Sequence, residues 1–409
     1  MKKISYLPLA ALLVANTISY IGNALALVAI PWFVIETTGS ALQTGLTGFF
    51  AALPLVLAGL FGGTIVDRLG YKTTSVVADV VSGIAVVLIP VLFVSVGLQF
   101  WQLLGLVFLG GLLDVPGGSA RESLIPELAA TSDISLERAN AAFDMTRRLS
   151  TLIGAPLAGV LIAAFGVETL LWLNALSFGV SALLIALAVP AFTKVATSER
   201  QSYLIELREG LQFLRHEQLL SALIVTFALI NLIGAPFYAV ILPVYASQVY
   251  NSAIALGVMT ASTAVGGLVG ALLFGAIGSM LSKRMILVAV ALFTALRYAT
   301  LAMLPPLSVS ILVLAAAGLM FGPLNPMTST LVQERTPLLM RGRIFGFLEA
   351  LTSASIPVGM LLGGYLLEIF GLQTVLFMQA ALSLALGINV LLQKVFRTMD
   401  SRGSTSPVS

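Results

Sequence analysis

The sequence predicts an all-α membrane protein with twelve transmembrane helices arranged in two pseudo-symmetric six-helix bundles. Three observations favour this fold. Hydrophobic residues make up 58% of the 409-residue chain and charged residues only 10%, whereas a soluble domain carries about 25% charged residues. The apolar stretches are long enough to cross a bilayer as helices, which requires about 20 residues each. The two halves of the chain also repeat one pattern of glycine, proline and acidic positions.

Twelve apolar stretches account for most of the chain. In order, we expect spans at residues 6–35, 42–66, 73–96, 101–121, 139–165, 168–191, 218–249, 254–279, 285–304, 307–329, 343–369 and 371–394. An even number of spans places both termini on one side of the membrane. Lys and Arg gather in the segments on that side, and the loops on the opposite side contain none. The positive-inside rule therefore predicts cytoplasmic termini in a cell inner (plasma) membrane.

The internal repeat predicts the domain organisation. Gly45 matches Gly257 at an offset of 212 residues, and Asp144 matches Glu349 at an offset of 205. Parallel repeats related by an axis along the membrane normal are typical of secondary transporters. The predicted domains are an N-terminal six-helix bundle (1–193), a cytoplasmic linker with an amphipathic helix (194–217), a C-terminal six-helix bundle (218–397) and a disordered tail (398–409).

Several functional classes are disfavoured by what the sequence does not contain. It has no cysteine and one histidine, His216, in the predicted linker. No glycine-rich phosphate loop or nucleophile elbow is present. We therefore expect no enzymatic activity, no catalytic residues, no metal and no cofactor. The net charge of +3 sets membrane topology and does not indicate a nucleic-acid partner. The expected partners are the lipid bilayer, protons and a small amphipathic substrate, and we expect a monomer.

Ionisable residues within predicted spans are the strongest functional signal, because each costs at least ~2.5 kcal/mol at the bilayer centre. Asp114 lies near the middle of the fourth span. Burial there favours its neutral form, so it is a candidate for proton binding, and a permanent salt bridge with an Arg is the alternative. Glu349 has no Lys or Arg within four residues on its own helix and is a second candidate.

Three of the other charged residues within the spans bear on function or structure. Asp144 is a third proton-coupling candidate, but Arg147 and Arg148 follow it at helical spacing, which favours a structural ion network. Asp79 lies about two turns into the third span and is expected to join the charged network at the cytoplasmic face. Arg297 lies deep in the ninth span and requires a carboxylate partner or water.

Polar and aromatic residues on the first, seventh and tenth spans are candidates for a substrate cavity. Such faces suit an amphipathic solute, and the alternative is hydrogen bonding between helices. The candidates are Asn16, Tyr20, Asn23, Asn231, Tyr238, Phe321 and Asn325.

A short charged turn joins the second and third spans, and Asp67 is its unusual member. A nearby Arg or the N-terminal end of a helix would stabilise this carboxylate at the edge of the hydrocarbon. We expect Arg341 and Arg343, at the start of the eleventh span, to be its partners in a charge latch that opens and closes. The turn as a whole contains Gly63, Asp67, Arg68, Gly70 and Lys72.

This pattern, Gly-x-x-x-Asp-Arg-x-Gly-x-Lys between the second and third spans, resembles the cytoplasmic loop motif of the major facilitator superfamily. A second stretch, which contains Gly154, Pro156 and Gly159, resembles the Gly-Pro-x-x-Gly-Gly motif of drug:proton antiporters, although Ala155 and Val160 replace two of its glycines. The run from Pro126 through Asn140, followed by residues 154–166, is similar to the macrolide-efflux and enterobactin-exporter branch.

The resemblance implies a twelve-helix fold with alternating access and proton-coupled efflux of an amphipathic molecule such as a drug, macrolide or siderophore. Two alternatives within transport remain open, an uptake symporter or uniporter and a lipid or lysolipid flippase. Arg297 is the sequence cue for the flippase. A receptor or chaperone that transports nothing is a further alternative.

Overall fold

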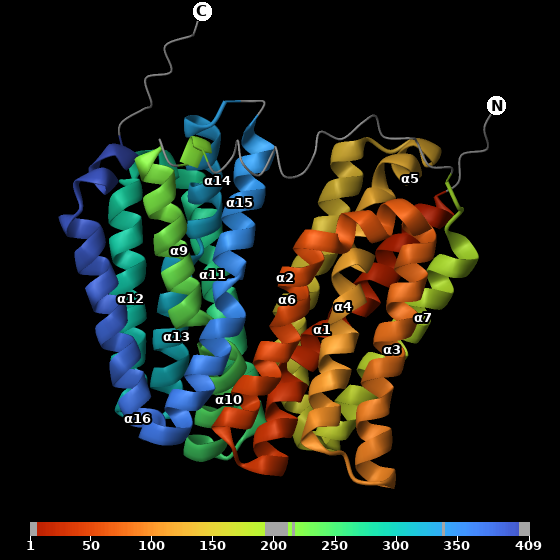
Figure 1. Cartoon of the computed structure of the whole chain (residues 1–409), viewed down its shortest axis with the longest axis horizontal. Coiled ribbons are helices and arrows are strands. Elements are labelled where there is room, and N and C mark those ends of the chain that lie inside the picture. Colours follow the sequence, from red (N-terminus) through yellow and green to blue (C-terminus); the bar gives the residue numbers. More distant parts are fainter. Residues whose placement is uncertain (1–5, 193–211, 215–216, 338–339, 401–409) are drawn as a thin grey trace, which may run out of the picture. The chain divides into compact units, whose positions relative to one another are not determined.

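The computed structural model describes residues 6–192, 212–214, 217–337 and 340–400, and the side chains at 59–68, 279 and 342–343 fall outside this description. These ranges form helices and short connections, with no strand among them. The first part of the chain forms α1 (Leu7–Thr38), α2 (Ala41–Leu69), α3 (Tyr71–Ser95), α4 (Phe100–Ser123), α5 (Ile125–Thr131), α6 (Leu136–Phe165) and α7 (Val167–Ala188). The second part forms α9 (Gln218–Pro236), α10 (Leu242–Tyr245), α11 (Ala253–Ile277), α12 (Lys283–Ala302), α13 (Leu307–Phe321), α14 (Leu324–Arg335), α15 (Arg341–Ser353) and α16 (Ser355–Leu392), as Figure 1 shows.

Eleven segments of the described chain are long and apolar enough to span a membrane. The first ten overlap the first ten predicted spans. The last, Ile344–Leu392, contains 49 residues and covers both the eleventh and the twelfth predicted span. A continuous helix of that length would measure about 74 Å, more than twice the ~30 Å hydrocarbon core. The predicted linker, 194–217, lies outside the described residues except for 212–214 and 217.

Gly371 interrupts this last segment. Its backbone has φ 74° and ψ 168°, which is not helical. Gly166, between α6 and α7, has nearly the same conformation, with φ 81° and ψ 161°. Only glycine adopts this region of conformational space without strain. The two glycines are also partners in the sequence repeat, so the chain turns in the same way between α6 and α7 and within α16.

The contacts divide the chain into two compact units. Unit 1 comprises Met1–Ala196, Tyr238–Ala261 and Met360–Glu368, and unit 2 comprises Thr197–Phe237, Ser262–Gly359 and Ile369–Ser409. Within unit 1, α1 packs against α6 and α7, and α3 packs against α4 and α7. Within unit 2, α12 packs against α13 and α9 against α15. The limits of these units fall within helices and differ from the limits of the two predicted six-helix bundles. The division into two bundles therefore stays a prediction.

Two pairs of glycines hold helices of unit 1 in close contact. A Cβ atom added to Gly45 of α2 would lie 2.7 Å from the Met360 carbonyl oxygen and 2.8 Å from the Cα of Gly364 in α16. The second pair repeats this geometry, because a Cβ on Gly159 of α6 would lie 3.0 Å from the Cα of Gly257 in α11. Each residue of the first pair is the repeat partner of one in the second. The internal repeat read from the sequence is therefore also present in the packing.

Asp400, the last described residue, contacts the start of α12. The Asp400 carboxylate accepts hydrogen bonds from the Lys283 backbone N–H at 2.7 Å and from the Ser282 hydroxyl at 2.6 Å. These groups lie at the N-terminus of α12, where a negative charge is stabilising. Met399 is buried. Within the predicted disordered tail, Met399 is thus packed and Asp400 is hydrogen-bonded, and residues 401–409 lie outside the described chain.

We expect Gly45→Ala to lower the thermal stability of the purified protein, because its methyl group would force α2 away from the backbone of α16. Overpacking of this kind costs ~1–3 kcal/mol. Gly105→Ala in α4 is the matched control, since a Cβ there meets no atom within 4 Å and alanine favours a helix. Equal melting temperatures for the two variants in detergent would contradict the close contact.

Candidate functional site

Asp114 lies on α4 and has incomplete partners. Its Oδ2 accepts a hydrogen bond from the Asn23 side-chain amide of α1 at 3.0 Å. Its Oδ1 lies 3.9 Å from an Arg121 nitrogen, and 28% of the side chain is exposed. That oxygen has no hydrogen-bond partner among the described residues. Asp114 is therefore held by one amide and one distant cation, which is weak compensation for a charged carboxylate inside a membrane helix.

Arg121, on the same helix, forms a short ion pair with a different acid. Its Nη1 donates a 2.7 Å hydrogen bond to Asp79 of α3, and both side chains are 1% exposed. The Ser181 hydroxyl of α7 donates to the other Asp79 oxygen at 2.6 Å. A charge-assisted hydrogen bond of this length is among the stronger contacts available to a protein. Asp79, Arg121 and Asp114 therefore form one cluster, the ion triad, with two carboxylates and one guanidinium.

Local helix geometry explains this arrangement. Asp114 and Arg121 are seven residues apart on α4, so two turns bring them to the same helix face. Gly117 lies between them, and a Cβ there would be 2.6 Å from the Ala78 side chain of α3. The missing side chain allows α3 and α4 to pack closely, which places Asp79 beside Arg121. The sequence analysis expects Asp79 in a charged network at the cytoplasmic face, and its described partners are Arg121 and Ser181.

Asp144 and Glu349, the other predicted acids, have different surroundings. Asp144 accepts hydrogen bonds from Arg147 at 2.9 Å and Arg148 at 2.6 Å on its own helix. This confirms the intrahelical ion network. Glu349 is exposed and accepts a hydrogen bond from the Ser353 hydroxyl at 3.3 Å, without an ion pair among the described residues. Neither acid is half-buried with an oxygen that lacks a hydrogen-bond partner among the described residues, as Asp114 is.

The predicted charge latch is only partly described. The side chains of Gly63, Asp67, Arg68 and Arg343 lie outside the described residues. Gly70 has φ 83° between α2 and α3, as expected of a glycine that permits a turn. Lys72 donates to the Ala186 carbonyl at 2.8 Å. Arg341 donates to the Gln333 carbonyl at 2.8 Å and the Thr336 carbonyl at 3.3 Å, at the end of α14.

Three of the predicted cavity residues form hydrogen bonds between helices, which was the alternative interpretation. Asn16 is fully buried and donates to the Thr146 hydroxyl at 2.8 Å. Asn23 donates to Asp114, and Asn231 donates to the Thr352 carbonyl at 3.0 Å. Among the other candidates, Tyr20 is half-buried, Tyr238 and Asn325 are exposed, and Phe321 lines a pocket in unit 2.

The stretch with Gly154, Pro156 and Gly159 packs closely, as its small residues predict. A Cβ on Gly154 would lie 2.3 Å from the Ala24 side chain of α1. Gly159 contacts Gly257, and Pro156 lies inside α6. The backbone of this stretch of α6 therefore packs closely against α1 and α11.

Sequence reasoning missed three residues of functional interest. Arg121 is not among the predicted site residues, although its spacing of seven from Asp114 is a usable signal. Ser181 carried no signal. Glu368 is not among the predicted site residues, but its carboxylate accepts hydrogen bonds from the Leu42 backbone N–H at 3.1 Å and the Ser40 hydroxyl at 3.2 Å, at the start of α2.

Comparison with known sequences places the chain in a family. Residues 12–338 and 230–407 match the Major Facilitator Superfamily. The multidrug efflux pump Tap of Mycobacterium tuberculosis is 32% identical over 398 residues, which cover 96% of this chain and 95% of that protein. Macrolide efflux protein A of Streptococcus pyogenes is 22% identical over 394 residues, which cover 94% of this chain and 95% of that protein.

A solved structure supports the same fold. The nucleoside transporter NupG superposes with a TM-score of 0.79 at 13% sequence identity, and the match covers 94% of this chain and 98% of NupG. At this level of identity the likeness concerns the fold alone. The apolar helices, the internal repeat, the family match and this structural likeness agree. The chain is a multi-pass membrane transporter that belongs to the major facilitator superfamily.

Proposed function

We propose that this transporter is a proton-coupled exporter that moves amphipathic small molecules out of the cell by alternating access. Drugs, macrolides or siderophores are the substrate classes we favour. The ion triad is the observation that supports proton coupling, because two carboxylates share one buried guanidinium. The similarity to a multidrug efflux pump and a macrolide efflux protein supports the direction of transport.

Charge balance explains why Asp114 is the proton-binding member. With both acids ionised, the triad carries one net negative charge in a medium where charge is costly. A single proton neutralises it. Asp79 is held at 2.7 Å by Arg121, whereas Asp114 lies 3.9 Å from the same guanidinium. Protonation of Asp114 therefore removes the weaker ion pair, Asp114–Arg121, and leaves the stronger pair, Asp79–Arg121, intact.

Protonation would also change a contact between helices. Asn23 of α1 donates to Asp114 of α4, and a protonated carboxyl group becomes a donor itself. The proton thus alters how α1 is held against α4. In the proposed cycle, Asp114 takes a proton from outside and releases it to the cytoplasm, and the change at α1 biases the transporter toward one of its two states.

The architecture that we propose for this function has twelve spans in two six-helix bundles, with both termini in the cytoplasm and a monomeric chain. The break at Gly371 divides Ile344–Leu392 into the eleventh and twelfth spans. The latch of Asp67 with Arg341 and Arg343 belongs to this proposal and would stabilise the outward-open state. Glu349 remains an alternative proton carrier.

We expect Asp114→Asn to abolish transport driven by a pH gradient, because an amide cannot carry the proton. In inverted vesicles with an imposed gradient, the wild-type exporter should accumulate a labelled macrolide, and the variant should match vesicles without the protein. Asn can replace Asp114 as the acceptor for Asn23, so the melting temperature should change little.

Two variants control this experiment. Asp144→Asn removes an exposed carboxylate already paired on its own helix, and it should transport normally. Glu349→Gln tests the competing carrier. Undiminished accumulation by the Asp114 variant would exclude Asp114 from coupling, and a defect only in the Glu349 variant would transfer the role to Glu349. If wild-type vesicles of the opposite orientation accumulated the macrolide instead, the protein would be an importer.

We expect Asp79→Asn to destabilise the protein much more than Asp114→Asn. The change leaves the buried Arg121 with only a distant carboxylate, and removing one partner of a buried ion pair costs ~3–5 kcal/mol. Thermal unfolding in detergent and the yield of folded protein measure this effect. A melting temperature equal to that of the Asp114 variant would show that the Asp79–Arg121 pair is not the structural member of the triad.

A further inference from the structure

Glu368 links α16 to the start of α2 within unit 1. Its Oε2 accepts hydrogen bonds from the Leu42 backbone N–H at 3.1 Å and from the Ser40 hydroxyl at 3.2 Å. Ser40 precedes α2, and its hydroxyl also accepts from the Gln43 backbone N–H at 3.2 Å. The N-terminus of a helix leaves its first N–H groups unpaired and carries a positive partial charge. A carboxylate from a second helix therefore completes the cap of α2.

The helices meet at nearly bare backbone one turn away from this link. A Cβ added to Gly364 of α16 would lie 2.7 Å from the Ala41 carbonyl oxygen and 2.8 Å from the Gly45 Cα of α2. Such a contact is supported by van der Waals packing and weak Cα–H contacts, with little side-chain chemistry. Glu368 adds charge-assisted hydrogen bonds to it, and these are the stronger kind of contact.

The second close contact of unit 1, between α6 and α11, lacks this acid. Ser252 precedes α11, and its hydroxyl accepts from the Ala255 backbone N–H at 3.2 Å, as the Ser40 hydroxyl does at the start of α2. Glu368 lies four residues after the close-packed glycine of α16, whereas the residue four after the corresponding glycine of α6 is Ala163. The two contacts are thus related by the sequence repeat, but only one of them has a carboxylate.

We propose that Glu368, bound to Ser40 and Leu42, is an outer latch that holds α2 against α16 and keeps the outer end of the transporter closed. The proposal rests on alternating access, in which contacts between the two sequence halves part at one end in each state. In the proposed topology this end of α2 faces the outside, where the loops contain no Lys or Arg. The helix N-terminus is therefore the positive partner of the carboxylate.

The strength of the outer latch suits a contact that opens repeatedly. Glu368 is exposed, so water can replace its two hydrogen bonds when the helices part, and no buried polar group is left unpaired. Loss of an anion at an exposed helix N-terminus should raise the ratio of open to closed outer ends about 5-fold, which corresponds to ~1 kcal/mol. A shift of this size changes the population of two states without unfolding the protein.

A single reporter thiol can measure this ratio, because the chain has no cysteine of its own. Ala41 is 6% exposed and its carbonyl lies against Gly364. Ala41→Cys should therefore react with a charged, water-soluble methanethiosulfonate reagent only when α2 and α16 part. In the purified full-length protein in detergent, adding Glu368→Ala should raise the reaction rate about 5-fold.

Ala163→Glu tests the same interaction at the related contact. The new carboxylate should bind the Ser252 hydroxyl and the Ile254 backbone N–H, which are the repeat counterparts of the Ser40 and Leu42 groups. Because both contacts must part before the outer end opens, this change should slow the Ala41→Cys reaction. In the Glu368→Ala protein it should restore the slow rate, which a merely structural defect would not allow.

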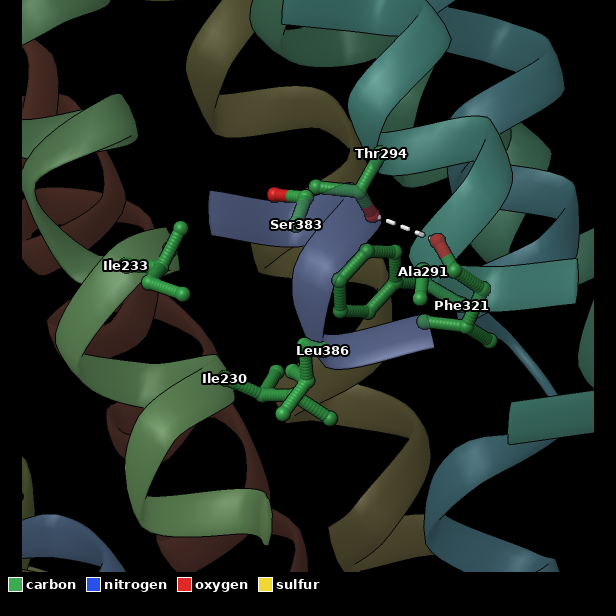
Figure 2. Close-up of a pocket in the computed structure, with 9 residues that line it drawn as sticks. Ile230, Ile233, Ala291, Thr294, Phe321, Ser383 and Leu386 are labelled. Atoms are coloured by element: carbon green, nitrogen blue, oxygen red, sulfur yellow. Dashed lines mark hydrogen bonds between the residues drawn. The ribbon is translucent and has the colours of Figure 1, made fainter. Parts of the chain in front are cut away.

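A reporter in unit 2 controls for general loosening. Ala291 of α12 is buried and lines a small pocket with Ile230 and Phe321, as Figure 2 shows. The Ala291→Cys rate should be the same with and without Glu368, because the outer latch lies in unit 1.

Two results would overturn the proposal. One is an Ala41→Cys rate that Glu368→Ala leaves unchanged, and the other is an equal acceleration of the Ala41 and Ala291 reporters. The measurement uses neither a pH gradient nor a substrate. In the Asp114→Asn background the 5-fold ratio should therefore persist although gradient-driven transport is lost, so a failure of proton coupling is distinguished from a failure of the outer latch.

Discussion

The hydrogen-bonded ion pair between Asp79 and Arg121 is the contact on which the core of unit 1 most depends. Both side chains are 1% exposed, so neither charge is compensated by water. Because the pair joins α3 to α4 and Ser181 brings in α7, three helices must keep their positions for the charges to stay matched. Asp114 shares the same guanidinium at a longer distance, 3.9 Å, and 28% of its side chain is exposed.

Unit 2 contains a comparable buried guanidinium with a different environment. Arg297 lies against Phe237 and Tyr298, where Arg121 has Asp79. The ring faces offset only part of the cost of burying the charge. Arg121 has its anion built into the protein, whereas Arg297 has aromatic rings and no carboxylate of the described residues within salt-bridge distance.

Close helix contacts place these charges and follow the sequence repeat. Gly45 with Gly364, and Gly257 with Gly159, allow nearly identical approaches of backbone to backbone. Gly117 does the same between α3 and α4, which positions Asp79 beside Arg121. Because apolar burial drives helix association only weakly inside a bilayer, small residues at such contacts are a principal determinant of packing. The positions of the glycines therefore decide which polar side chains can meet.

The sequence by itself determined the membrane-spanning helices, the internal repeat and the resemblance to the family, because hydrophobic length and glycine spacing are local properties. It also predicted that Asp114 either binds a proton or forms a salt bridge with an arginine. For Asp144 it predicted an ion network with arginines on the same helix. Only the tertiary structure decided that Arg121 binds Asp79, that Asn16 and Asn231 join helices, and that Arg297 lies against aromatic rings. Those contacts link residues far apart in the chain, and helix spacing carries no information about which faces of different helices meet. The physical reason is that the free energy of a buried charge depends on its neighbours in space, which the order of residues along one helix does not specify.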